Sequence, residues 1–372
     1  MAASGVDALL TCDPFSVRYA TGTRNMLVHG LTGPDRLALV IVHGPTVLWE
    51  FGGCEHLSAA APHVDHQRVA PALSAKKRVD PSGEIERFAR EIVADLATFV
   101  GPNATIALDR IEPPVASAIE RRGLRLCDGV AVMQAAMAIK QPAEIDAMQR
   151  AMVATEAATA AMQRSIEPGR TEQSVWAEFH RALIESGGEL VVTRLLQAGA
   201  RTFPYFQEAS DHMLSAGDLV CFDSDAVGAG GYSVDFSRTF LCGDVMPSER
   251  QRSLYRLALD QLEHNASNLA AGRSFESFAA AAFDVPEPHA RYGYYQLAHG
   301  LGLAGGHPNV PRVGEDPYPL PGCFEPGMVI CVESYVGDPD TNQGVKLENQ
   351  YLIGDDGVEQ MSTYPMSDVL AG

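Results

Sequence analysis

The segment from residue 218 to residue 243 constrains the fold of this chain more than any other. Two runs rich in strand-forming residues, 219–222 and 233–241, flank a glycine-rich stretch that permits a sharp reversal. Asp223 and Asp225 are two residues apart, which on a strand directs both side chains to the same face. Asp235 returns on the second run. We therefore expect two neighbouring strands with three aspartates facing one space.

Three carboxylates gathered where strands end need a compensating positive charge, because like charges in a poorly solvated site cannot all stay ionised. A divalent metal ion would supply it. Two other interpretations fit the turn alone. One is a solvated acidic turn, and the other is a calcium loop, which requires a glutamate at its twelfth position, where Val234 stands. Residues further along the chain favour the metal site.

Three more candidate ligands follow in the last third of the chain. His299 precedes a run of small residues, Glu333 is expected at the end of an apolar strand, and Glu348 lies on another predicted strand. A glutamate at the inner end of an apolar strand is costly unless it is paired or metal-bound. With the three aspartates they make a set rich in oxygen ligands that is large enough for two divalent ions. Such a set favours Mn, Fe or Co over a structural zinc held by cysteines.

The composition limits the class of protein. The 372 residues are 46% hydrophobic, enough for a core and for more than one domain. The net charge of −19 argues against a nucleic-acid or membrane partner held by electrostatics. Seven dispersed cysteines indicate a reducing compartment. We recognise neither a secretory leader nor a long apolar span, and therefore expect a cytoplasmic protein.

Two domains are predicted, at residues 1–135 and 136–372. The first alternates strand-like runs with a helical period over residues 82–100, which is typical of an α/β domain. The second begins with two predicted helices, 144–166 and 174–184. The stretch that starts at Gly169 resembles the one that starts at Gly272, at a constant offset of 103 residues. This repeat suggests a duplicated helix–helix–strand unit.

Five motifs in this order resemble the M24 peptidase superfamily, which includes methionine aminopeptidases, prolidases, Xaa-Pro aminopeptidases and creatinase. They are Gly217-Asp218-Leu219-Val220, Gly231 to Phe240, His299-Gly300-Leu301-Gly302, Glu325-Pro326-Gly327-Met328 before Glu333, and Val345-Lys346-Leu347-Glu348. The resemblance covers residue 136 to the end, and the N-terminal third is similar to the creatinase-type N-terminal domain. It implies an α/β domain followed by an α+β pita-bread catalytic domain with pseudo-twofold duplication. It also implies a homodimer and, as metal ligands, Asp235, His299, Glu333, Glu348 and one or both of Asp223 and Asp225.

Two departures from the family pattern bear on the reaction. Most members have a single first aspartate where this chain has Ser224; the aspartates on either side of it are similar to the dimethylsulfoniopropionate lyase branch. Tyr205 stands where peptidase members usually have a histidine. However, the lyase branch has its proton-abstracting aspartate at the position of Gly305. Because a positioned general base contributes about 10²–10⁴-fold, a lyase without it should be slow.

We predict a dinuclear metal-dependent hydrolase that cleaves a small amide or an Xaa-Pro-type peptide through a metal-bound hydroxide, with Glu333 moving the proton. His307 resembles a histidine near the metal in the peptidases, and Tyr294 resembles a tyrosine of the lyase branch; both are candidate catalytic residues. Their alternatives are a loop histidine and a strand aromatic. Arg238 is expected to support Asp235 or neighbouring carboxylates. The alternative functions are a dimethylsulfoniopropionate lyase and an inactive pita-bread binding protein.

Overall fold

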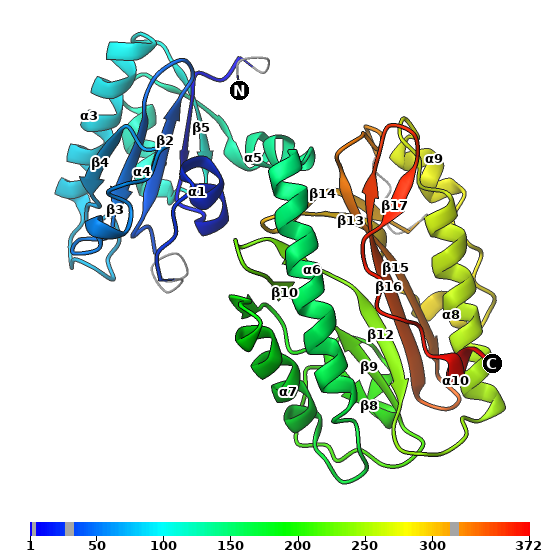
Figure 1. Cartoon of the computed structure of the whole chain (residues 1–372). Helices are drawn as coiled ribbons and strands as arrows, with labels where there is room; N and C mark the ends of the chain where they lie inside the picture. Colours follow the sequence, from blue (N-terminus) through cyan, green and yellow to red (C-terminus); the bar gives the residue numbers. More distant parts are fainter. Residues whose placement is uncertain (2–4, 27–32, 313–319) are drawn as a thin grey trace. The chain divides into compact units, whose positions relative to one another are not determined.

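The computed structural model describes residues 1, 5–26, 33–312 and 320–372. The chain forms two compact units, Met1–Ala136 and Met137–Gly372. Figure 1 shows their elements coloured along the sequence. Among the described residues, none of the helices is both long enough and apolar enough to cross a membrane.

The first unit is built on a six-stranded sheet of order β4-β3-β2-β1-β5-β6. Strand β1 pairs antiparallel with β2 and parallel with β5. Helix α3 carries the expected helical period, and its Phe88 packs edge-to-face on Trp49 of β3. The elements are β1 (Ala8–Thr11), α1 (Pro14–Thr21), β2 (Leu37–Ile41), β3 (Thr46–Glu50), a 3₁₀ turn (Glu55–Leu57), β4 (His66–Val69), α3 (Ser82–Phe99), β5 (Thr105–Asp109), α4 (Pro113–Glu120) and β6 (Arg125–Asp128). Helix α5 (Gly129–Ala138) leads into the second unit.

The second unit has strands between two pairs of helices. Its first half comprises α6 (Pro142–Gln163), α7 (Glu172–Glu185), β7 (Leu190–Val191), β8 (Leu196–Ala198), a 3₁₀ turn (Gly199–Thr202), β9 (Leu219–Asp223), β10 (Ala226–Val227), β11 (Ser233–Val234) and β12 (Ser237–Leu241). Its second half comprises α8 (Glu249–Ser267), α9 (Phe275–Ala280), a 3₁₀ turn (His289–Tyr292), β13 (Gln296–Leu301), β14 (Gly305–Pro311), β15 (Val329–Asp338), β16 (Gln343–Ile353), β17 (Val358–Gln360) and α10 (Asp368–Ala371).

The strands of this unit form a five-stranded sheet, β14-β13-β15-β16-β17, and two three-stranded sheets, β12-β9-β8 and β11-β10-β7. In Figure 1, α6 and α7 lie on one side of these strands and α8 lies on the other. Two separate apolar cores follow from this layering. One is built around α6, α7 and β9, and the other around α8, α9 and β15. The polar side chains of the strands between the cores are therefore deeply buried.

The sequence repeat has a structural counterpart. Thr171 begins α7 and Ser274 begins α9; the side chain of each accepts a hydrogen bond from the backbone N–H three residues later. Such an N-cap satisfies a backbone donor that the helix leaves unpaired. The glycines two residues before the caps, Gly169 and Gly272, both have a left-handed backbone, with φ of 87° and 79°. The same local solution thus opens the second helix of each half.

Three local expectations were wrong. The second strand of the aspartate segment is two strands, β11 and β12, interrupted at Asp235. The apolar strand before Glu333 does not end there, because β15 continues to Asp338 and is buried throughout. Asp225 lies beyond the end of β9 with φ of 36°, in the left-handed region. The alternation of side chains along a strand therefore does not apply to Asp223 and Asp225.

Candidate metal centre

Neighbouring strands bring the candidate ligands together. Asp223 is the last residue of β9. Asp235 precedes β12, which pairs antiparallel with β9. In the other sheet, Glu333 of β15 lies directly opposite Glu348 of β16. His299 is on β13, which pairs with β15. Since Gly300 has no side chain, the backbone of His307 can pass close to it; a Cβ at Gly300 would lie only 2.1 Å from the His307 carbonyl oxygen.

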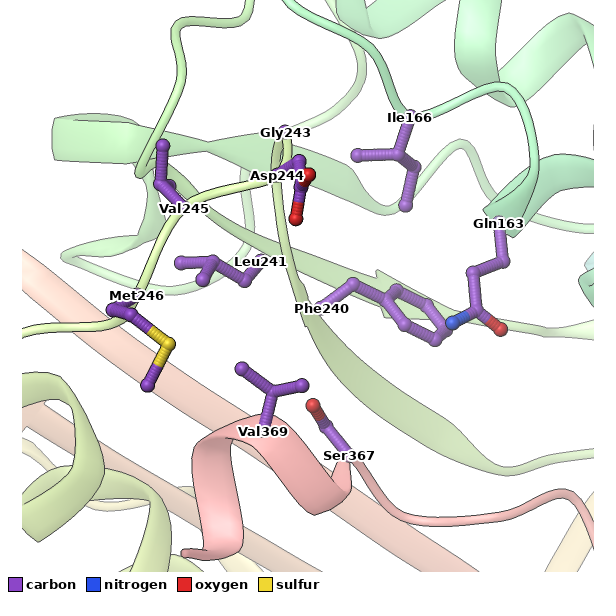
Figure 2. Close-up of a pocket in the computed structure, with 10 residues that line it drawn as sticks. All are labelled: Gln163, Ile166, Phe240, Leu241, Gly243, Asp244, Val245, Met246, Ser367 and Val369. Atoms are coloured by element: carbon purple, nitrogen blue, oxygen red, sulfur yellow. The ribbon is translucent and has the colours of Figure 1, made fainter.

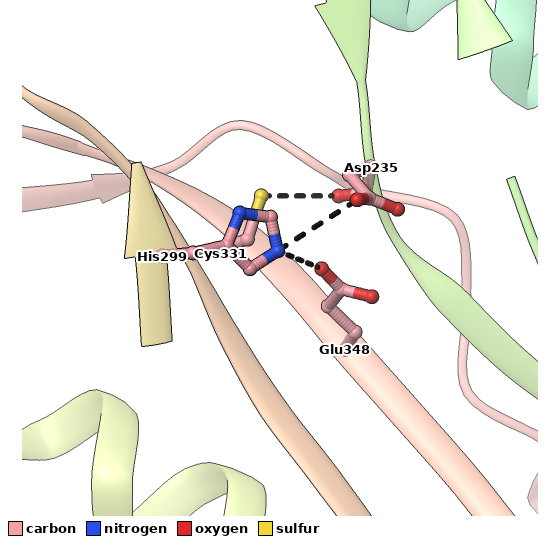
Figure 3. Close-up of side chains that lie close together, drawn as sticks. All are labelled: Asp235, His299, Cys331 and Glu348. Atoms are coloured by element: carbon pink, nitrogen blue, oxygen red, sulfur yellow. Dashed lines mark hydrogen bonds and ion pairs between the residues drawn. The ribbon is translucent and has the colours of Figure 1, made fainter. Parts of the chain in front are cut away.

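His299 is the point on which three carboxylates converge (Figure 3 shows two of them). Its Nε2 lies 3.4 Å from Glu333 Oε1, 3.5 Å from Glu348 Oε1 and 3.7 Å from Asp235 Oδ2. Ligand atoms about 2.1 Å from a shared tetrahedral ion would be separated by roughly the same distances. One imidazole nitrogen and several carboxylate oxygens form a donor set that suits a borderline divalent metal.

Unpaired oxygens support the same interpretation. Among the residues that the structure describes, Asp223 Oδ1, Asp235 Oδ1 and Glu348 Oε1 are buried and accept no hydrogen bond. A buried acceptor without a partner costs about 1–3 kcal/mol, and a charged one costs more. Within the described part of the chain, one group of side chains has ligand atoms close enough to hold an ion: Asp235, His299, Cys331 and Glu348, all within 4.8 Å of one another. These residues fit a metal ion.

A lysine outside the predicted ligand set lies among the carboxylates. Lys346 Nζ is 2.6 Å from Glu333 Oε2, 2.9 Å from Glu348 Oε2 and 2.6 Å from Ser237 Oγ, to each of which it donates a hydrogen bond. Its side chain is fully buried. Each glutamate therefore has one oxygen facing His299 and the other bound to this ammonium group. Lys346 orients both glutamates and neutralises part of their charge.

The first two aspartates lie at the edge of the centre. Asp223 Oδ2 accepts a hydrogen bond from the Tyr205 hydroxyl at 2.7 Å and lies 3.6 Å from Lys346 Nζ. Asp225 accepts a hydrogen bond from Thr193. Neither aspartate belongs to the group around His299 within the described residues. A second ion would therefore need a position that these two aspartates share with Asp235.

The electrostatics indicate a site that is short of positive charge. Burial, and then the carboxylate of Asp223, raise the pKa of Asp225 to about 7. Burial and the neighbouring carboxylates also raise the pKa of Asp235 well above its usual range. Burial lowers the pKa of His299, but Glu333 and Glu348 outweigh this effect and raise it to about 10. Without a metal the centre thus favours bound protons, and a divalent cation would replace them.

An aromatic cluster adjoins the centre. It consists of Tyr205, Phe206, Tyr294, Tyr295 and Tyr335, whose neighbouring ring centroids are 4.8–6.0 Å apart. Lys346 Nζ lies 4.8 Å from the Tyr294 ring centroid, within the range of a cation–π contact. Burial and nearby Glu333 raise the pKa of Tyr294, so its hydroxyl keeps its proton. Phe206 and Tyr295 are about half exposed. The cluster therefore extends from the carboxylates to the protein surface.

His307 and Arg238, both singled out in the sequence, have contacts outside the group around His299. The ring of His307 packs edge-to-face on Phe275 of α9, at a centroid distance of 5.5 Å, so its observed packing is with the core around α8 and α9. Arg238 supports the neighbouring candidate ligand Glu348 through its backbone, rather than Asp235 through its carboxylate. Its guanidinium donates to backbone carbonyls of Ser237, Glu348 and Tyr364 and to the Asn349 side chain.

A cavity of about 340 Å³ lies elsewhere in this unit, between the end of β12, the end of α6 and α10 (Figure 2). Its walls are mainly apolar and include Phe240, Leu241 and Val369. None of the candidate ligands lines it. We therefore do not place the reaction there.

Comparison with known proteins gives the family. The sequence profile of metallopeptidase family M24 matches residues 146–355. The dimethylsulfoniopropionate lyase DddP of Roseovarius nubinhibens is 33% identical over 98% of this chain and 83% of its own length. The probable dipeptidase PepE of Mycobacterium tuberculosis is 27% identical over 61% of this chain and 59% of its own length.

The fold is shared with solved prolidases. The prolidase from Pyrococcus horikoshii superposes with a TM-score of 0.80, at 19% identity, over 99% of this chain and 96% of its own. This likeness confirms the predicted pita-bread fold. The profile match and the relative that is 33% identical over 98% of this chain together show that the chain belongs to metallopeptidase family M24.

Proposed function

We propose that this protein is a metal-dependent hydrolase that cleaves a small amide, such as an Xaa-Pro dipeptide. The observation that carries the proposal is the convergence of Glu333, Glu348 and Asp235 oxygens on His299 Nε2 in a buried site. These four residues would hold one divalent ion. Asp223 and Asp225, with the free oxygen of Asp235, would hold a second ion. When bound, the metal would supply a Lewis acid and an activated water molecule.

The chain's own groups provide the rest of the chemistry. Burial raises the pKa of Glu333, but Lys346 and His299 outweigh burial and hold it below its usual range. Glu333 is therefore ionised, the form in which a carboxylate can bind an ion and accept a proton. Lys346 holds the second oxygen of Glu333 and thereby fixes the direction of the first. The aromatic cluster provides apolar surface for the substrate next to these groups.

The experiment measures the hydrolysis of several dipeptides with and without added metal. Protein stripped with a chelator is reloaded with Mn²⁺, Fe²⁺ or Co²⁺ and offered a panel of Xaa-Pro dipeptides. We expect hydrolysis that returns only with metal. His299→Ala should lower kcat/KM by more than about 10²-fold, beyond the usual effect of a residue next to the ligands. His307→Ala, in the same hairpin but packed on Phe275, should have a much smaller effect. Equal losses would support the predicted catalytic role of His307.

Elimination of dimethyl sulfide from dimethylsulfoniopropionate is the second candidate. Two observations favour it: the match to a lyase over 98% of this chain, and an aromatic cluster with exposed faces beside carboxylates, a setting that attracts onium cations. Gly305 argues against it, because this position provides no base. Release of dimethyl sulfide by the wild-type protein, without turnover of any dipeptide, would replace the hydrolase proposal with the lyase.

The Gly305→Asp variant sharpens this comparison. Gly305 has an ordinary backbone conformation, and a Cβ built there meets no described atom within 4 Å. An aspartate therefore fits without strain. If the chain retains a lyase site that lacks only its base, this variant should gain about 10²-fold or more in elimination. An unchanged elimination rate would count against the lyase.

A further inference from the structure

Cys331 is a buried thiol that the proposed mechanism does not use. It lies on β15, two residues before Glu333, so both side chains leave the strand on the same face. In the register of the sheet it is directly opposite His299. Its Sγ lies within 4.8 Å of ligand atoms of Asp235, His299 and Glu348 (Figure 3). The thiol therefore belongs to the same group of donor atoms as the expected metal ligands.

The hydrogen bond that the Cys331 thiol makes is weak. Cys331 Sγ donates a long hydrogen bond of 3.6 Å to the backbone carbonyl of Asp235. A cysteine is a poor hydrogen-bond donor, so this contact does little to hold the sulfur in place. The side chain is completely buried in the core around α6, α7 and β9.

A second, independent observation points to a ligand at the same place. Within the described residues, Glu348 Oε1 and Asp235 Oδ1 are buried without a hydrogen-bond partner, and Glu348 is fully inaccessible to solvent. These oxygens and the Cys331 sulfur come from three different segments of the chain. Unpaired acceptors beside a sulfur indicate a cation that sulfur and oxygen both contact.

We propose that Cys331 is a further metal ligand of this centre and that its sulfur makes the centre selective for borderline and soft divalent ions. The inference rests on the proposed function, because it needs the ion held by His299, Asp235 and Glu348. Thiolates favour such ions over Mg²⁺ and Mn²⁺, which prefer oxygen ligands. A coordinated thiol loses its proton. Binding therefore forms one metal–sulfur bond, breaks the S–H bond and releases one proton to the solvent.

Cobalt is a probe that separates this inference from the proposed function. Bound Co²⁺ gives visible d–d absorption with any ligand set, whereas a thiolate ligand adds a charge-transfer band in the near ultraviolet. We would titrate reduced, metal-free, full-length protein with Co²⁺ and record both bands. The variants are Cys331→Ser and, as a matched control, Cys221→Ser. Cys221 is equally buried, but its thiol contacts the Gly344 carbonyl and Thr239.

The expected result is both bands in the wild type and in Cys221→Ser, and the d–d bands alone in Cys331→Ser. Cys331→Ser should also lose about tenfold or more in Cd²⁺ affinity while its Mn²⁺ affinity changes little. If the wild type gives d–d bands without the charge-transfer band, or if Cys331→Ser keeps that band, the inference is wrong although the metal centre stands. If equilibrium dialysis finds no Co²⁺ on the wild-type protein, the proposed function fails as well.

Circular dichroism and thermal unfolding of each variant without metal would verify its fold. Should Cys331→Ser unfold, the wild type still decides the question, because the charge-transfer band must titrate in proportion to the d–d bands up to the same endpoint. A charge-transfer band that grows only after the d–d bands have saturated would place the sulfur on other, adventitious metal and overturn the inference.

Discussion

Two buried lysines of the second unit show how differently one residue type can be stabilised. Burial lowers the pKa of Lys346, but Asp223, Glu333 and Glu348 outweigh burial and raise it well above its usual range. Burial also lowers the pKa of Lys140, and there the effect prevails, to about 8. The Lys140 ammonium donates to the backbone carbonyl of Ala138. The carboxylates around Lys346 therefore stabilise its cationic form, whereas burial destabilises the cationic form of Lys140.

Replacement of each lysine by methionine should have different effects. Lys346→Met removes the donor shared by Ser237, Glu333 and Glu348 and should lower the free energy of unfolding by about 3–5 kcal/mol, the usual cost of breaking a buried ion pair from one side. Lys140→Met keeps the volume and removes an unfavourably buried charge, so its stability should fall by less than about 1 kcal/mol or rise. Urea unfolding of metal-free protein at neutral pH measures both values.

A metal ion should reduce the difference between the two variants. With saturating Mn²⁺, Lys346→Met should recover part of its loss, because the divalent ion neutralises the same glutamates. Equal losses for the two variants, with and without metal, would show that Lys346 only fills space. A loss for Lys346→Met that grows when metal is added would mean that the lysine mainly positions the ligands.

The sequence predicts that the candidate acidic residues lie near one another. A carboxylate on a buried strand is costly unless it is paired or metal-bound, so each one indicates a partner nearby. The prediction missed Lys346 and Cys331, although each lies two residues from a candidate ligand, Glu348 and Glu333. On a strand this spacing places them on the same face. That signal was present in the sequence. Their contacts depend on the pairing of β13, β15 and β16, which the local sequence does not specify.

At the scale of elements, β15 and α8 are joined by polar contacts as well as by apolar packing. Ser334 of β15 donates to the Ala258 carbonyl of α8. At the end of β15, Asp338 accepts hydrogen bonds from Arg250 at 2.7 Å and from Thr341. The hydrogen bond from Arg250 lowers the pKa of Asp338 to about 2. This ion pair ties the first turn of α8 to the strand that carries Glu333.

The Asp338 pair predicts a pH dependence. A carboxyl group whose folded pKa is lowered stabilises the fold above its unfolded pKa, and the stabilisation disappears as pH falls toward the folded value. Asp338→Asn should therefore lower stability by about 1 kcal/mol at neutral pH, a figure discounted because Arg250 is half exposed. The difference from wild type should shrink as pH falls from about 4 to about 2.

Urea unfolding of both proteins at several pH values in this range measures the difference. Asp340→Asn is a suitable control, because it removes an acid from the same turn and leaves the Asp338 carboxylate in place. A gap between wild type and Asp338→Asn that stays constant on acidification would show that the ion pair does not set the stability of this junction.

The elements themselves were predictable to different degrees. The long helices α3 and α6 follow from their helical periods, and the repeated motif marks the start of α7 and of α9. The extension of β15 past Glu333 was not predictable from local pattern. Its last residues include Ser334 and Asp338, and polar residues normally signal the end of a buried strand. Here they remain buried only because α8, distant in sequence, supplies their partners.

At the scale of the whole molecule, the apolar cores follow the division of the chain. The core of the first unit draws on residues between Ala8 and Leu124. The two cores of the second unit draw on residues from Ala138 onward. The domain assignment from sequence rests on the change of character near residue 136, and independent folding of the two parts stays a prediction. Each unit has the buried apolar residues that a domain of its size needs.

A fragment of residues 137–372 tests that prediction. Since its cores contain no residue from the first unit, it should unfold in one cooperative transition. Every candidate metal ligand lies within it, so its Co²⁺ affinity should stay within about threefold of the full chain, a difference below about 1 kcal/mol. The matched fragment, residues 1–136, should fold but should bind Co²⁺ far more weakly than the full chain does. A 137–372 fragment that folds but binds Co²⁺ more than about tenfold more weakly would show that the first unit helps to shape the metal centre.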